Sequence, residues 1–236
     1  GGRQQIALWE WTVDREGPLY SADVTVGLQT CVRFNASDIR QVVSNGPQRV
    51  VFWDWEQKRF KFYSPPISQH DFRQSVGAFT QSLFLPESTQ AISATDDGDI
   101  VLWDRSLVGM GEGFGRATDK RAIKIIRLSN KGAIRFLAIQ DGLLVTGGDD
   151  GAVRFYDLQF RITAWFEDLE AGPVSSVSFA NVAPPKLALL RRIMRTCDKL
   201  FATIGSADVW SPREGAARLN CHTHKPCLHS RMCLAA

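Results

Sequence analysis

The stretch "SATDDGDIVLWDRS" at residues 93–106 decides how this sequence folds. It joins the dipeptide Asp97-Gly98 to an apolar run that ends in Trp103-Asp104. Asp-Gly tolerates positive φ and favours a tight hairpin turn, while "IVLW" has the character of a buried strand. The stretch is therefore predicted to form a hairpin whose second strand ends at Trp103.

The same pattern recurs elsewhere in the chain. Each copy is a β-prone run that ends in an aromatic residue and an acid, and the pairs are Trp9-Glu10, Trp53-Asp54, Trp103-Asp104 and Tyr156-Asp157. Gly-containing turns precede the last three copies, at Asn45-Gly46, Asp97-Gly98 and Asp150-Gly151. The aromatic residues stand 44, 50 and 53 residues apart, a spacing that indicates a repeat architecture.

Further strand-like runs flank each hairpin. They lie upstream at 30–37, 80–87 and 133–140, and downstream at 58–64, 121–129 and 161–167. Four short antiparallel strands every ~40–50 residues are typical of a β-propeller blade. A lone four-stranded sheet cannot bury both faces, so blades stack, and the aromatic residues are expected to fill the space between them. A generic β-sandwich would not explain the recurring aromatic-acid endings.

Residues 1–181 are therefore predicted to form an incomplete, all-β propeller of about three whole blades plus partial blades. A closed propeller typically takes 4–8 blades, so we expect the chain to be a fragment of a larger protein. After a first strand at 174–181 the pattern stops. Residues 200–210 read as a weak blade remnant within a divergent tail, 182–236.

Charge is distributed unevenly along the chain. The body, residues 1–181, has 19 Lys/Arg and 22 Asp/Glu, while the tail, residues 182–236, has 9 and 3. A mildly acidic body gives no electrostatic case for nucleic-acid binding. The mixed aromatic and basic run at 47–63 fits blade strands better than a nucleic-acid platform. No secretory signal or apolar run of ~20 residues is present, so we expect a soluble intracellular protein without membrane contact.

The tail raises the question of zinc. Cys221, His224, Cys227 and Cys233 are the candidate ligands. Structural zinc sites usually take separated ligand pairs with a small core between them, and neither is evident here. A disordered tail is therefore favoured over a metal site.

Three other patterns invite a chemical interpretation, and each lacks a required part. The acids at 96–99 lack the alternating ligands and closing Glu of a calcium loop. The run "GMGEGFG" has Phe114 where a dinucleotide fingerprint needs glycine. His70 is the only histidine before the tail, and no Gly-x-Ser-x-Gly elbow exists. We therefore expect no catalytic residue, no cofactor and no enzymatic activity.

The repeats and the segments that link them carry a family resemblance. The segments are "LWEWTV", "SVGAFTQSLF" (75–84), "AISATDDGDIVLWD" and "VRFYDLQFRITAW" (153–165). Over residues 6–180 the chain resembles the WD-repeat family, and within it the cilia- and flagella-associated WD-repeat proteins of the calmodulin- and spoke-associated complex. The resemblance implies a non-enzymatic scaffold of the axoneme that helps connect the radial spoke base, the doublet microtubule and dynein regulation. The alternative is a WD-repeat adaptor outside cilia, for trafficking or ubiquitin-ligase assembly.

The sequence also departs from the family pattern. Asp97 and Asp150 match the family's turn aspartate, but position 47 is proline. The Gly-His pair of such repeats is absent from all three copies. The family's polar network of His, Asp, Ser/Thr and Trp should then be incomplete, and apolar packing should carry more of the stability.

Overall fold

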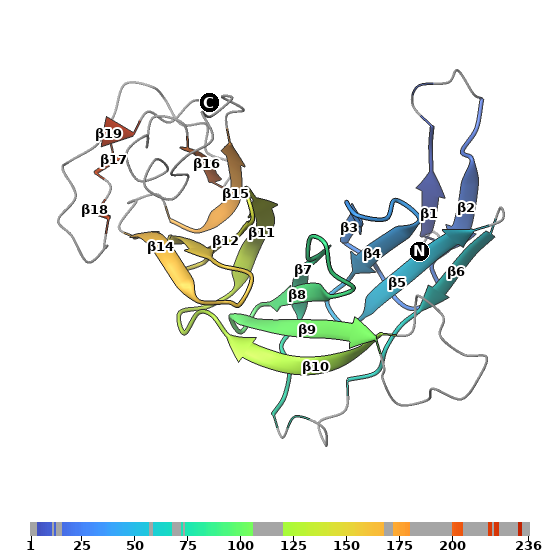
Figure 1. The fold of residues 1–236 in the computed structure, drawn as a ribbon, viewed down its shortest axis with the longest axis horizontal. Coiled ribbons are helices and arrows are strands. Elements are labelled where there is room, and N and C mark those ends of the chain that lie inside the picture. The colour runs from blue at the N-terminus through green and yellow to red at the C-terminus, as the bar shows by residue number, and fades with distance from the viewer. Residues whose placement is uncertain are drawn as a thin grey trace. The chain divides into compact units, whose positions relative to one another are not determined.

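The computed structural model describes residues 4–10, 12, 16–56, 59–67, 72, 74–105, 120–167, 172–179, 200–204, 217–218, 220–221 and 231–232 (Figure 1). Every element with bounds among these residues is a β-strand, and the sheet pairings are antiparallel, which confirms the all-β class. The strands fall into two compact units, Gly1–Asn130 and Lys131–Ala236. Within the described residues, we find no helix with the length and apolar character that crossing a membrane requires.

The first unit contains two four-stranded sheets and a smaller one. The first sheet has the order β3 (Cys31–Phe34), β4 (Gln41–Asn45), β5 (Val50–Glu56) and β6 (Arg59–Tyr63). The second has β7 (Phe79–Phe84), β8 (Ala91–Thr95), β9 (Asp99–Arg105) and β10 (Lys120–Arg127), again in chain order. β1 (Gln5–Leu8) and β2 (Tyr20–Asp23) form a two-stranded sheet. Figure 1 shows the chain-order neighbours of each large sheet side by side, as the predicted meander requires.

The second unit repeats this plan once. Its main sheet has the order β11 (Ile134–Gln140), β12 (Leu143–Gly148), β13 (Val153–Tyr156), β14 (Ile162–Glu167) and β18 (Asn220–Cys221). Two-stranded sheets join β15 (Val174–Phe179) to β16 (Leu200–Ile204) and β17 (Ala217–Arg218) to β19 (Arg231–Met232). β16 lies within residues 200–210, the predicted weak blade remnant, and therefore beyond the predicted boundary at residue 181. That domain boundary stays a prediction.

The inner strands of the first sheet, β4 and β5, are buried on both faces. Phe52 of β5 packs with Phe84 and Trp103 of the second sheet in one apolar cluster. On the opposite face, Val51 and Trp53 pack with residues of β1 and β2 in another cluster. Strands buried on both faces read as near-continuous apolar runs, which explains "RVVFW". Full burial of each large side chain contributes roughly 1.5–3 kcal/mol.

Two of the predicted Gly turns have left-handed glycines. Gly98 and Gly151 have φ values of 85° and 71°, in the region that glycine adopts most readily. The Gly98 amide donates to the Thr95 carbonyl at 3.3 Å, and the Gly151 amide to the Gly148 carbonyl at 3.1 Å. A hairpin turn therefore lies at Asp97-Gly98 and at Asp150-Gly151.

The first hairpin differs from the prediction of a positive-φ turn at Asn45-Gly46. Asn45 pairs with Val50 as the last rung of the ladder, and the loop consists of residues 46–49. Gly46 has no positive φ; a Cβ there would lie 1.6 Å from the Leu28 carbonyl oxygen. Gly46 does not hold the position equivalent to Gly98: Gln48, a poor residue for positive φ, stands five residues before Trp53 as Gly98 stands before Trp103. Glycine at 46 thus serves a close backbone approach.

Stacked four-stranded sheets are what a propeller predicts, and the first unit shows that stacking. The described residues show no closed ring of sheets, so the propeller itself stays a prediction.

Candidate functional site

The repeated aromatic residues of the three large sheets are buried, and each has a hydroxyl partner in its own sheet. Trp53 and Trp103 are 1% and 0% exposed. The Trp53 indole N–H donates to the Ser44 hydroxyl at 2.8 Å, and that of Trp103 donates to Ser93 Oγ at 2.9 Å. In the second unit the side chains of Tyr156 and Thr146 are hydrogen-bonded. A buried aromatic with a polar atom needs such a partner, and each of the three large sheets supplies one.

These pairs extend into short polar networks that the sequence interpretation missed. Ser93 Oγ lies 2.6 Å from Ser82 Oγ, and the Ser44 hydroxyl donates to Gln29 Oε1 at 2.8 Å. The polar network is therefore built from serine and glutamine, in addition to the apolar packing that we expected. The signal was present: a Ser or Thr precedes each buried aromatic by nine or ten residues.

Trp9 corrects the expectation that every repeat aromatic fills space between sheets. It is 56% exposed. It lies one residue beyond the end of β1, whose sheet has only two strands, so no ladder holds its side chain against a neighbouring sheet.

The aspartates that directly follow the repeated aromatics accept hydrogen bonds from residues of neighbouring loops. Asp104 accepts hydrogen bonds from Thr89 Oγ1 at 2.7 Å and Gln90 Nε2 at 3.1 Å. Burial raises the pKa of Asp104, but these hydrogen bonds outweigh it and hold the pKa below its ordinary value. Asp157 accepts from the Arg161 amide at 2.9 Å and the Arg161 side chain at 2.7 Å, which lowers the pKa of Asp157. Asp54, the equivalent residue of β5, is half-buried.

The turn acids divide between the surface and ion pairs. Asp97 is exposed, while Asp150 is half-buried and its carboxylate pairs with Arg154 at 2.6 Å. No group of three His, Cys, Asp or Glu side chains gathers as metal ligands in the part of the chain that the structure describes. Of the zinc candidates, Cys221 is placed only as a strand residue of β18, and His224, Cys227 and Cys233 lie outside the described residues, as does His70. The absence of cofactors and metals stays a prediction.

A buried lysine, which no sequence pattern pointed to, joins the two large sheets of the first unit. Lys120 is 2% exposed, with Nζ 5.6 Å from the ring centre of Phe52 and 5.7 Å from that of Phe84. Nζ also donates to the Thr89 carbonyl, and the charge of Asp104 acts on it. Burial is the main cause that lowers the pKa of Lys120 to about 8, against the opposing attraction of Asp104.

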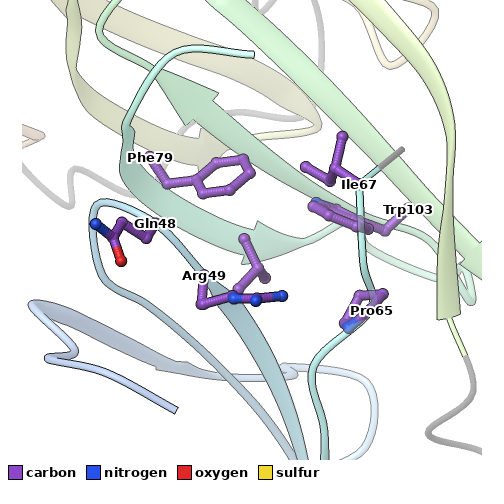
Figure 2. Close-up of a pocket in the computed structure, with 7 residues that line it drawn as sticks. Gln48, Arg49, Pro65, Ile67, Phe79 and Trp103 are labelled. Atoms are coloured by element: carbon purple, nitrogen blue, oxygen red, sulfur yellow. The ribbon is translucent and has the colours of Figure 1, made fainter. Parts of the chain in front are cut away.

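A pocket of about 300 Å³ lies where the first and second sheets meet at one end (Figure 2). It is lined by Gln48, Arg49, Val50, Pro65, Ile67, Phe79 and Trp103. Figure 2 shows the Phe79 and Trp103 rings and Ile67 on one side, with Arg49 and Gln48 facing them across the space. Trp103 and Phe79 are buried, whereas Arg49 and Gln48 are exposed and form the rim. None of the described lining residues is an acid, histidine, serine or cysteine.

Comparisons with known proteins agree on one family. A sequence model described as the CFAP251 N-terminal domain matches residues 1–201. Over 202 residues the chain is 44% identical to "Cilia- and flagella-associated protein 251" of Chlamydomonas reinhardtii, covering 79% of this chain and 24% of that protein. The protein of the same name from Tetrahymena thermophila is 39% identical over 193 residues, covering 75% of this chain and 19% of its own length. The chain thus spans about a quarter or less of these curated relatives.

Proposed function

The chain belongs to the CFAP251 N-terminal domain family, and we propose that it forms part of a non-enzymatic scaffold in the axoneme of motile cilia and flagella. The family's named members are cilia- and flagella-associated, and so is this chain. The observation that carries the proposal is the recurring four-stranded sheet with buried inner strands, which builds a rigid body with many exposed loops. Loops on a rigid scaffold are where protein partners bind.

In this proposal, the sheets are blades of a WD-repeat propeller. Three features support it: four-stranded antiparallel meanders in chain order, sheets packed face to face in the first unit, and a buried aromatic with a hydroxyl partner in each of the three large sheets. Apolar residues on the partly covered face of the first sheet also agree with a propeller. Val32 and Phe34 of β3 are 59% and 54% exposed, because the two-stranded sheet of β1 and β2 covers only part of that face. A complete neighbouring blade would bury them.

A non-enzymatic role agrees with how the polar residues are used. The acids of the repeats hold turns and loops through hydrogen bonds and ion pairs, such as Asp104 with Thr89 and Asp150 with Arg154. An enzyme would need a nucleophile or a general acid or base directed into a pocket, and the described lining residues of the pocket in Figure 2 include none.

The partners that we propose are proteins: the calmodulin- and spoke-associated complex, the base of a radial spoke and axonemal microtubule proteins. The test is to remove the parent protein from a flagellated cell and re-express it with a tag. Loss of radial-spoke attachment and altered beating, both restored by the tagged protein, would support the scaffold. Normal spokes and normal motility without the protein would overturn it. A tagged protein that is absent from axonemes would favour the adaptor role outside cilia.

A further inference from the structure

The turns between the second and third strands of the three large sheets differ in charge. In the second sheet, Asp99 pairs with Arg127 at 2.5 Å. In the second unit, Asp149 pairs with Arg135 at 2.8 Å, and a further pair joins Asp150 to Arg154 at 2.6 Å. Asp99, Asp149 and Asp150 are thus neutralised inside their own sheets, whereas Asp96 and Asp97 in the turn of the second sheet are exposed.

The first sheet reverses this charge. Its turn, residues 46–49, has no acid and ends in Arg49, which stands four residues before Trp53 as Asp99 stands four residues before Trp103. The segment after β6, "SPPI" at residues 64–67, has no charged residue where the second sheet has Arg127. Arg49 is exposed, and among the described residues no carboxylate forms an ion pair with it. The turn therefore presents a cation that its own sheet does not neutralise.

This cation stands at the rim of the pocket in Figure 2. The pocket floor consists of Phe79 and Trp103, and its sides include Pro65 and Ile67. An apolar cavity of about 150 Å³ is enough to hold benzene, so a pocket of about 300 Å³ has room for one bulky apolar side chain. The pocket has aromatic rings at its base and an arginine at its rim, and tryptophan and arginine are enriched in binding hot spots.

We propose that this pocket docks an acidic peptide segment of a protein partner. One bulky apolar side chain of the peptide enters against Ile67 and Phe79, and a neighbouring carboxylate binds the Arg49 guanidinium through two hydrogen bonds. The commitment to a carboxylate rests on charge complementarity, since no described acid forms an ion pair with Arg49. The proposal names a partner class for the scaffold function proposed above and rests on it.

The experiment uses the whole chain and three labelled peptides. They are Glu-Glu-Phe-Glu-Glu, the same peptide with Ala for Phe, and the same peptide with Gln for every Glu. Fluorescence anisotropy gives the dissociation constant of each. We expect the first peptide to bind at least tenfold more tightly than the other two, because each lacks one of the two contacts.

Variants locate the binding. Arg49→Gln should weaken binding of the first peptide about tenfold or more, and Ile67→Ala should weaken it as well. Arg121→Gln, which removes an exposed arginine on β10, is the matched control and should leave binding unchanged. Arg49→Glu should transfer the preference to Lys-Lys-Phe-Lys-Lys, and this gain keeps the test valid if affinity losses arise from misfolding.

Two results would overturn the proposal: no binding of the first peptide at millimolar concentration, or equal losses for Arg49→Gln and Arg121→Gln. Failure of the pocket is distinguishable from failure of the scaffold function. If the tagged parent protein restores spoke attachment while its Arg49→Glu variant does so equally well and the peptides do not bind, only the pocket proposal falls.

Discussion

At the scale of single residues, the buried aromatics combine apolar packing with one satisfied polar atom. The Trp103 ring lies edge-on to Phe52, with ring centres 5.9 Å apart, and its N–H is bonded to Ser93. Edge-to-face pairs contribute about 0.5–1.5 kcal/mol beyond area burial. The serine matters because a buried N–H without a partner costs about 1–3 kcal/mol.

Replacing Trp103 and Ser93 separately tests how much the apolar packing and the hydrogen bond each contribute to stability. Trp103→Ala should lower the free energy of unfolding by about 3–5 kcal/mol through the cavity it leaves, and Ser93→Ala by about 1–3 kcal/mol. The control is Trp9→Ala, which should cost less than about 0.5 kcal/mol because Trp9 is 56% exposed. Urea unfolding measures all three. A Trp9→Ala cost as large as that of Trp103→Ala would contradict the packing described here.

Lys120 predicts a pH dependence of stability. Its pKa is lowered to about 8 in the folded protein, and the ordinary value of 10.5 applies when the chain unfolds. Between these values the unfolded chain binds the proton that the folded chain has lost, so the free energy of unfolding rises with pH. The slope is at most about 1.4 kcal/mol per pH unit.

Urea unfolding at pH 7 to 10 should show this rise, and Lys120→Met should remove it while keeping the contact with Phe52 and Phe84. Above pH 10 the raised pKa of Tyr156 acts in the opposite direction, because the folded protein then holds the tyrosine proton longer. An equal pH slope in the Lys120→Met variant would contradict the assignment.

At the scale of elements, the hairpins show two uses of glycine at related positions. Gly98 supplies a left-handed turn, whereas Gly46 makes room for the Leu28 carbonyl. Asparagine distinguishes the two, because it tolerates left-handed backbone better than alanine but is larger.

We therefore expect Gly98→Asn to be less destabilising than Gly98→Ala, which should cost about 1–2 kcal/mol. At position 46 the order should reverse, with Gly46→Asn at least as damaging as Gly46→Ala. The unfolding midpoints of the four variants check this. If asparagine were the milder substitution at both positions, Gly46 would be a turn glycine after all.

At the scale of the whole molecule, the chain has two compact units, and the apolar clusters described above belong to the first. Phe52→Ala should therefore raise amide hydrogen exchange mainly in β3 to β10. Leu144→Ala, in β12, should do so mainly in β11 to β14, and each substitution should cost about 2–5 kcal/mol. Exchange followed by mass spectrometry resolves the strands. Equal loss of protection in both units after either substitution would show a single cooperative core.

Much of the fold was predictable because it depends on local pattern. The apolar runs, the Gly turns at residues 98 and 151, and the strands around Trp53 and Trp103 were all expected. The pocket was not, since its lining comes from four separate segments of the chain. Nor was the exposure of Trp9, whose local sequence matches that of the buried tryptophans.

By itself, the sequence determined the all-β class, the positions of the strands and the repeat, because strand and turn preferences act between neighbouring residues. The tertiary structure alone decided that Lys120 lies between Phe52 and Phe84, that serines hold the tryptophans, and that Arg49 stands at the rim of a pocket. Those contacts join residues distant along the chain. Their desolvation and charge exist only once the sheets have packed.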